Sequence, residues 1–362
     1  MNIFVMNTNF ETVDIIDSYE SIIWTDRYNE SGDFELYTPF DLKLLRIVHQ
    51  DYYLMTLESD HIMIIEGLEI LSDAETGNHI RIIGHSLESI LNRRIVWSQT
   101  SVTGSLQNAL KRLITDAIIE PSIEDRQISN FIFEESEDER ILSLNLEHEY
   151  TGNNLYEIVE EACKINNLGF KITLNSSNQF VFKLYMGIDR SYSQTDTNNP
   201  YVVFSPNYEN IINSNYIDST ENMKNITLVM GEDSGSSRRS LTVGSGVGLT
   251  RRELYTDARD IQSEKVTDYD EALKQRGLRD LVDNSRTVSF EGEVEATRMF
   301  VYNTDFFMGD IIQIANEYGI EGSARVVEFI RSEDAEGFKQ YPTFEAIQDI
   351  DTSVGDLTNN EE

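Results

Sequence analysis

Apolar and polar residues alternate along residues 3–96 with the two-residue period of β-strands. Turn-forming residues separate the alternating segments, so the region is expected to consist almost wholly of strands. The strands are expected at residues 3–6, 12–16, 21–24, 34–38, 52–57, 62–66 and 80–83.

The clearest of these segments is residues 22–39. A strand rich in β-branched and aromatic residues leads into a Ser-Gly-Asp turn, after which Phe34 and Leu36 alternate with Glu35 and Tyr37. This pattern predicts a β-hairpin with Phe34 and Leu36 in a core and Glu35 and Tyr37 on the opposite face. It indicates architecture rather than catalysis.

Beyond these strands, the spacing of apolar residues changes in places from two residues to the three to four residues typical of helices. Apolar stripes predict helices over residues 105–119, 154–166 and 269–283, and a short helix is expected after Gly84. A hairpin is predicted between residues 170 and 185, around the turn at residues 175–178.

These elements predict a mainly β protein with α+β parts. The fold class is two tube-like β-barrel or sandwich domains and two smaller α+β domains, arranged as a duplicated two-domain module. The expected ranges are a first tube-like β domain at 1–96, an α+β domain at 97–200, a second tube-like β domain at 201–231 and 293–346, an inserted α+β unit at 232–292, and an acidic flexible tail at 347–362.

Composition narrows the classes of function. The 362 residues carry a formal net charge of −35, which argues against a bound nucleic acid because phosphate binding needs clustered Lys and Arg. The charge is explained either by a solvated acidic surface or by a surface that lets polyanions pass without holding them. Cys163 is the one cysteine, so a disulfide framework is excluded. No signal pattern and no apolar run of about 18 residues is present, so no stable membrane association is expected.

Candidate chemistry is sparse. The Gly-rich residues 244–248 lack the Gly-Lys-Ser/Thr ending of a phosphate loop, so they are expected to form a mobile loop that gates a channel, contacts a neighbour, or does neither. The five histidines lack close ligand spacing, and no nucleophile motif is present. We therefore expect no catalytic residue, no cofactor, no metal site and no enzyme activity.

Four segments carry a family resemblance. They are residues 24–39, with Gly32 and Phe34-Glu35-Leu36; residues 84–95, with Gly84-His85-Ser86-Leu87; residues 251–261, with Arg251-Arg252-Glu253; and residues 307–312, Phe-Met-Gly-Asp-Ile-Ile. In this order the chain resembles the tail hub proteins of long-tailed bacteriophages. The family includes the amino-terminal hub region of siphophage tail-associated proteins and the baseplate hub of contractile phages.

The resemblance implies a virion structural protein at the tail tip, made in the host cytoplasm. Three copies would form a ring that continues the tail tube, joins it to the distal tip and lines the exit channel for DNA, which would be present only in transit. The implied partners are a distal tail ring protein, the terminus of the tape-measure protein, and a tip or receptor-binding protein for host attachment.

Four residues are candidates for the subunit interface. Arg251 and Arg252 either form intrachain ion pairs or bridge to carboxylates of the next subunit, where guanidinium groups suit interfaces. Glu35 and Tyr37 are expected to face the channel or a neighbouring subunit.

Two other functions fit the same sequence. One is the equivalent hub of a phage-derived injection particle. The other is a monomeric carbohydrate-binding or carbohydrate-cleaving tail accessory protein with a concave aromatic site, and the lack of a signal pattern counts against secretion of such a protein.

Overall fold

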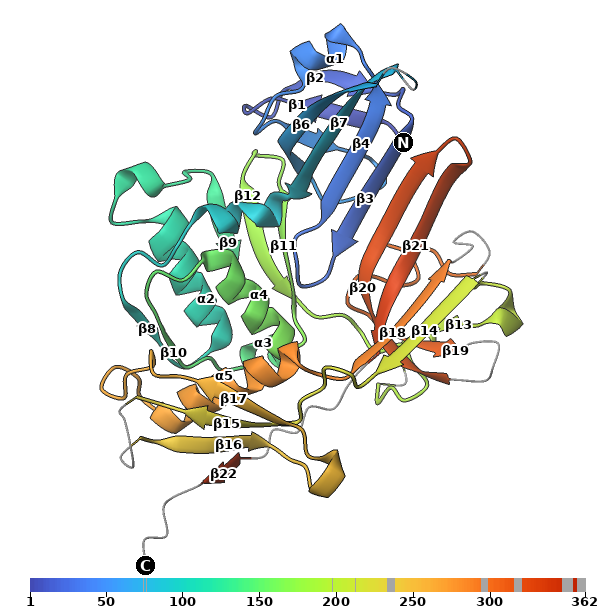
Figure 1. Cartoon of the computed structure of the whole chain (residues 1–362). Coiled ribbons are helices and arrows are strands. Elements are labelled where there is room, and N and C mark those ends of the chain that lie inside the picture. Colours follow the sequence, from blue (N-terminus) through green and yellow to red (C-terminus); the bar gives the residue numbers. More distant parts are fainter. Residues whose placement is uncertain are drawn as a thin grey trace, which may run out of the picture.

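The computed structural model describes residues 1–362 except residues 74, 76, 197, 212, 233–237, 294–298, 316–320, 347–353 and 357–362. Strands predominate in the described chain, and helices cover parts of the sheets (Figure 1). The predicted fold class, mainly β with α+β parts, is confirmed.

Thirteen of the described strands form one large sheet. Its path runs β14 (Asn213–Ser219), β18 (Thr287–Glu293), β21 (Gly337–Ala346), β20 (Glu321–Asp334), β3 (Ser21–Arg27), β4 (Asp33–Pro39), β7 (Gly77–Ser86), β6 (Met63–Asp73), β5 (Tyr53–Met55), β1 (Ile3–Met6) and β2 (Thr12–Ile16). The short strand β13 (Val203–Phe204) pairs with β19 (Ile311–Ala315), which pairs with β20.

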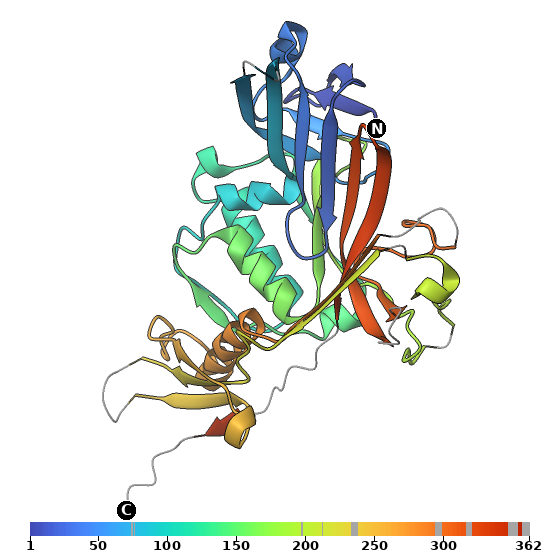
Figure 2. The same cartoon turned by 45° about the vertical axis from the view of Figure 1, so that its right-hand side comes forward.

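The long strand β20 connects the two β regions that the sequence separates. It pairs with β21 on one side and antiparallel with β3 on the other, with Arg331 opposite Trp24. Figure 2 shows the β20–β21 hairpin rising beside β3 and β4. The described path is open, with β14 and β2 at its ends, so the two tube-like regions share one sheet and neither closes as a separate barrel.

The remaining described strands form three smaller sheets. They are β9 (Phe131–Glu134) with β11 (Gly169–Leu174) and β12 (Phe180–Tyr185); β8 (Thr100–Val102) with β10 (His148–Tyr150); and β15 (Ile226–Met230) with β16 (Ser240–Gly244), β17 (Glu253–Asp257) and β22 (Val354–Asp356).

The predicted helices are present. They include α2 (Leu106–Ile114), which continues as a π-helical segment over Thr115–Ile119, α4 (Leu155–Ile165) and α5 (Tyr269–Asp283); α1 (Leu42–Ile47) and α3 (Glu139–Leu142) are shorter. The segment after Gly84 forms the 3₁₀ helix Leu87–Arg93. Asn154 caps α4 because its side-chain oxygen accepts the Tyr156 amide at 2.8 Å, and Asn167, at a φ of 55°, reverses the chain after the helix.

Four groups of buried apolar side chains form the cores. One underlies β3, β4 and β7 and includes Trp24, Phe34 and Leu36, as the hairpin pattern predicts. The second surrounds α2 and α4, the third lies between β19, β20 and β21, and the fourth lies where α5 covers β15 and β16.

The sheet pairing bears on two of the proposed domain boundaries. β15 pairs with β16 and β17 rather than with the large sheet, so the α5 unit begins before residue 231. Val354–Asp356, within the range expected to be a flexible tail, pair with β16, while the rest of that range lies outside the described residues. The domain ranges themselves stay a proposal.

Candidate functional site: the sheet junction and the assembly surfaces

Two of the segments that carry the family resemblance, residues 24–39 and 307–312, meet around Tyr28, at the end of β3. The Tyr28 ring is fully buried, and its hydroxyl donates a hydrogen bond to the Asn167 carbonyl at 2.9 Å. Its backbone amide donates to Val327 of β20, and its carbonyl accepts the amide of Phe170 in β11. Tyr28 therefore joins the first hairpin to both β20 and the α+β region. Burial raises the pKa of its phenol.

Two glycines allow this close approach. Gly309 has a φ of +87°, and a Cβ there would lie 2.2 Å from the Tyr28 ring. A Cβ on Gly32 would lie 2.1 Å from the Thr25 carbonyl oxygen, and the Gly32 amide donates to Ser86 Oγ at 2.7 Å. A side chain at either position would force the backbone apart.

Asp310, beside Gly309, holds the second half of the junction. Its buried carboxylate accepts the amides of Ile188 at 2.7 Å and Phe307 at 3.0 Å. The guanidinium of Arg190, itself buried, donates to the same carboxylate at 2.7 Å. Asp310 thus fixes the chain leaving β12 against the start of β19.

A buried ionic cluster lies where β3 pairs with β20. Arg331 of β20 donates to Asp26 of β3 at 2.6 Å, and both side chains are almost fully buried. Ser59 Oγ also donates to Asp26, at 2.8 Å. Burial opposes a charge on His61, but the carboxylates of Asp26 and Glu88 outweigh it and raise the pKa of His61 to about 9. His61 is therefore protonated at neutral pH beside these carboxylates.

The expected interface residues Glu35 and Tyr37 lie on the sheet face opposite the first core. Glu35 accepts hydrogen bonds from Arg81 of β7 at 2.6 and 2.9 Å, and Tyr37 stacks on His79 with ring centroids 4.8 Å apart. Both side chains are partly exposed. Their proposed role at an interface or channel stays a prediction.

The other two expected interface residues, Arg251 and Arg252, lie just before β17 in the four-stranded sheet. Arg251 pairs with Glu253, and Arg252 donates to the carbonyl and hydroxyl of Thr220. These intrachain contacts are the simpler of the two roles that the sequence allows. Arg251 remains 40% exposed, so its intrachain partner does not remove it from the surface.

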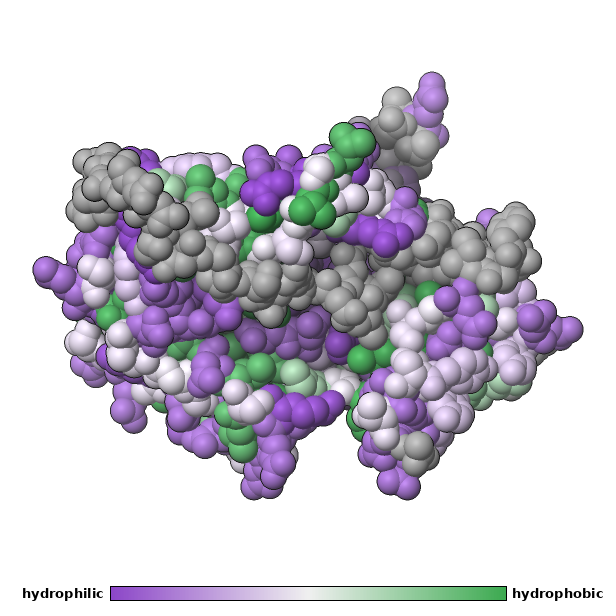
Figure 3. All heavy atoms as spheres, turned by 90° about the horizontal axis from the view of Figure 1, so that it is seen from below, coloured by the Kyte–Doolittle hydropathy of each residue, from purple (hydrophilic) through white to green (hydrophobic). Residues whose placement is uncertain are grey.

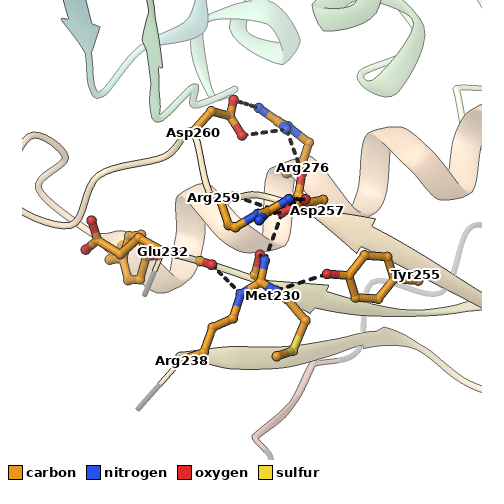
Figure 4. A network of polar contacts seen from close by, with 10 residues as sticks. Met230, Glu232, Arg238, Tyr255, Asp257, Arg259, Asp260 and Arg276 are labelled. Carbon is orange, nitrogen blue, oxygen red and sulfur yellow. Dashed lines mark hydrogen bonds and ion pairs between the residues drawn. The ribbon is translucent and has the colours of Figure 1, made fainter. Parts of the chain in front are cut away.

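A denser polar network lies at the ends of β15 and β17 (Figure 4). Arg238 donates to the carbonyls of Met230 and Gly231, to the Tyr255 hydroxyl and to Asp257, at distances from 2.7 to 3.0 Å. Hydrogen bonds from Arg259 hold the pKa of Asp257 at about 2. The contacts of Arg238 indicate a structural role, because they join the ends of β15 and β17.

The α5 unit meets the α+β region through polar side chains. Arg279 of α5 lies 3.3 Å from Glu161 of α4, and Arg276 lies 3.5 Å from the His148 ring of β10. The carboxylate of Glu147 accepts the amides of Thr267 and Asp268 just before α5. Burial, with the Arg276 charge nearby, lowers the pKa of His148 to about 4.

Within the described residues, no helix is long and apolar enough to cross a membrane, and no group of three His, Cys, Asp or Glu is placed to hold a metal ion. The sequence singled out Gly32, Gly84 and residues 307–312 but missed Asp26, His61, Arg190 and Arg331, because their partners lie far away in the chain.

The fold is that of phage tail proteins. The prophage MuSo2 43 kDa tail protein from Shewanella oneidensis matches with a TM-score of 0.59 at 13% identity, over 95% of this chain and 98% of that chain. The tail protein from Neisseria meningitidis MC58 matches with 0.58 at 12% identity, over 95% of each chain. Prophage tail protein gp18 from Listeria monocytogenes EGD-e matches with 0.56 at 13% identity, over 95% and 94%.

The chain belongs to the family of siphovirus ReqiPepy6 Gp37-like proteins, whose model matches residues 2–344. It is a phage tail protein and a structural component of the virion, and the resemblance to phage tail proteins is confirmed. The same fold occurs in a Francisella PdpA–VgrG complex, with a TM-score of 0.53 at 12% identity over 97% of this chain and 54% of that chain. A search of curated proteins finds no match.

Proposed function

We propose that this tail protein is a homotrimeric hub that joins the tail tube to the distal tip and lines the exit channel for DNA. The observation that supports it most is the open edge at each end of the large sheet. β2 pairs with β1 alone and β14 with β18 alone among the described strands. Exposed edges with apolar side chains invite pairing with another chain, so a stable protein covers them.

Both edges carry such side chains. Val13 and Ile15 of β2 are 42% and 45% exposed, and Ile217 of β14 is 40% exposed. Three copies would present six edges, which three-fold closure covers without leaving an open end. Each copy has two β regions, so a trimer would place six of them around the channel. Six similar regions would match the six subunits of a hexameric tail tube.

The charge of the chain suits passage of DNA. A net charge of −35 repels a polyanion, whereas a basic lining would retain it through counterion release. The partners of such a hub are the distal tail ring protein above it, the tape-measure terminus within it, and a tip or receptor-binding protein below it.

Native mass spectrometry with negative-stain microscopy tests the trimer. The expected result is a mass three times the 41.6 kDa of the chain and a ring with a central hole. A chain that stays monomeric up to about 100 µM, a concentration at which a micromolar contact would be saturated, would overturn the homotrimer.

A second candidate is the hub of a phage-derived injection particle. The fold shared with the Francisella PdpA–VgrG complex favours it, and the same trimer would serve both machines. Immunogold labelling decides between them: label at the tip of DNA-filled phages supports the phage hub, and label on headless particles supports the alternative.

A further inference from the structure

The loop between β16 and β17 carries two unusually exposed aliphatic side chains. Val247 is 82% exposed and Leu249 is 102% exposed, the highest values among the described large apolar residues. Leaving such side chains in water costs free energy that burial against a partner would recover. We call residues 247–252 the β16–β17 knob.

The knob is a fixed structure. The Asn225 side chain donates to the Thr250 carbonyl at 2.8 Å and accepts the Arg252 amide at 2.9 Å. The Thr250 hydroxyl donates to the Val247 carbonyl at 2.8 Å. The sequence predicts a mobile loop around residues 244–248, and these bonds hold its second half in place. Such preorganisation lowers the entropic cost of binding.

A cavity elsewhere on the chain is the second surface feature that bears on assembly. It has a volume of about 300 Å³ beside the carboxy-terminal end of α2, at the lower end of the range for binding pockets. Leu113, Ala117 and Val96 contribute apolar atoms, and the Trp97 ring, 59% exposed, stands at its side. The lining of this cavity also includes polar and charged side chains, as do the linings of the other three cavities described, one of which also borders Trp97.

Both the knob and the cavity carry charged side chains, some of which have partners within the chain: Arg251 pairs with Glu253, and Asp116 lies 3.8 Å from Arg112. Arg251 and Arg252 follow the knob's apolar residues in a chain where acids outnumber bases. Asp116 and Glu120 stand exposed at the cavity. Arg126 lines it too, but its guanidinium donates to the Ile95 carbonyl at 2.7 Å and lies over the Trp97 ring.

The two features lie on different parts of the molecule. The knob belongs to the small sheet at the bottom of Figure 1, whereas the cavity opens beside α2. Figure 3 shows the lower face, where hydrophobic residues form small separate groups among hydrophilic ones rather than one broad patch. A localised knob on such a face suits insertion into a small cavity.

We propose that the β16–β17 knob of one copy inserts into the Trp97 cavity of the next copy. Knob and cavity are different surfaces, so the contact is head-to-tail, and three such contacts close a ring. Leu249 and Val247 fill the cavity, while Arg251 and Arg252 face Asp116 and Glu120. This inference rests on the proposed homotrimer and names one of its contacts.

Disulfide trapping tests the contact directly. Cys163 is fully buried, so engineered surface cysteines react with each other rather than with it. A chain with Leu249→Cys and Ser98→Cys is expected to form covalent dimers and closed trimers under mild oxidation. The matched control pairs Leu249→Cys with Ser177→Cys, an exposed serine in the β11–β12 turn, and stays monomeric on a non-reducing gel.

Substitution separates the contact from the trimer as a whole. Leu249→Asp is expected to weaken trimer formation about tenfold or more, because each ring loses an apolar insertion at all three contacts. Leu57→Asp, at a leucine that is 80% exposed on another loop, leaves the trimer unchanged. The knob contact is overturned if the wild-type trimer is stable, Leu249→Asp leaves it intact and the cysteine pair forms no cross-link. The hub proposal would stand in that case.

Charge exchange supplies the final control. Arg251→Glu with Arg252→Glu weakens the trimer, as does Asp116→Lys with Glu120→Lys. A chain that carries all four changes is expected to recover the trimer, because every contact then pairs opposite charges again. If the losses from the two double variants add instead of cancelling, the proposed charge pairing is overturned. If the wild-type chain is monomeric and the chain with Leu249→Cys and Ser98→Cys forms no cross-linked species, both the contact and the trimer are overturned.

Discussion

The molecule is held together at two places that are built in opposite ways. At the upper one, around Tyr28 and Asp26, the two β regions share one sheet, and the buried Asp26 carboxylate accepts hydrogen bonds from Arg331 and Ser59. At the lower one, α5 meets α4 and β10 through polar side chains at the edge of two separate cores.

Buried polar atoms without a hydrogen-bond partner occur at both contacts. Among the described residues they include His148 Nδ1, Glu149 Oε2 and Arg276 Nε at the lower contact, and Trp24 Nε1, His61 Nδ1 and Glu88 Oε2 near the upper one. The difference therefore lies in the backbone: pairing between β3 and β20 holds the upper junction, whereas polar side chains form the lower contact. We expect the upper junction to fix the framework of the protein and the lower contact to orient the α5 unit with little effect on overall stability.

The largest expected effect comes from breaking the upper ion pair. Arg331→Met removes the guanidinium that pairs with the buried Asp26 carboxylate, so the free energy of unfolding is expected to fall by about 3–5 kcal/mol in urea titration. Lys43→Met, which removes the exposed partner of Asp14, serves as the control and changes nothing measurable. If Arg331→Met unfolds at the wild-type midpoint, the junction is not the framework described above.

Gly309→Ala tests the packing of the same junction. Its φ of +87° disfavours a side chain, and its Cβ would overlap the Tyr28 ring, so we expect a loss of about 2–4 kcal/mol. Gly337→Ala has a φ of +115° but open space around it, so it isolates the backbone cost of about 1 kcal/mol. Equal losses for the two variants in thermal unfolding would show that the contact with Tyr28 contributes nothing.

The two regions are expected to respond to pH in opposite directions. His61 binds a proton more tightly in the folded chain, with a pKa of about 9, so its contribution is present below about pH 6.5 and is lost as pH rises towards 9. His148 binds a proton less tightly in the folded chain, with a pKa of about 4, so stability falls as pH drops from about 6.5 to 4.

Melting temperatures from pH 4 to pH 10 measure both effects. Each is expected to be on the order of 1–2 kcal/mol. His61→Gln removes the alkaline part of the profile, and His148→Gln removes the acid part. A variant that keeps the slope assigned to its histidine would show that another group titrates there.

The smallest global effect is expected at the lower contact. Arg279→Gln removes the ion pair with Glu161, whose own pKa burial raises, and changes overall stability by less than about 1 kcal/mol. Hydrogen exchange of α5 amides is nevertheless expected to quicken, while β3 and β20 stay protected. Slow exchange throughout would mean that the two contacts are equally firm.

Local patterning was enough to predict the hairpin and the helices. Phe34 and Leu36 are buried, and α5 spans the predicted residues, because periodicity records which face of an element meets a core. Local patterning could not place β15, whose apolar residues suit either sheet; it pairs with β16 and β17 rather than with the large sheet.

Long-range pairs were equally invisible in the sequence. Asp26 and Arg331 are 305 positions apart, and each looks like an ordinary surface charge on a strand. The Met-Gly-Asp turn at residues 308–310 was recognised, but the role of its aspartate depends on Arg190 and Ile188 from another segment. The expected interface residues Glu35, Tyr37, Arg251 and Arg252 were all placed on the surface, and their role awaits the trimer experiments.

The pairing of β3 with β20 has a consequence for synthesis. The ribosome releases β3 roughly three hundred residues before its second partner, since the contact between Asp26 and Arg331 spans 305 positions. During that interval the outer edge of β3 has no native neighbour, and nascent copies on one polysome are close enough to pair through it. Translation speed and chaperone supply are therefore expected to limit the yield of this protein more than its final stability does.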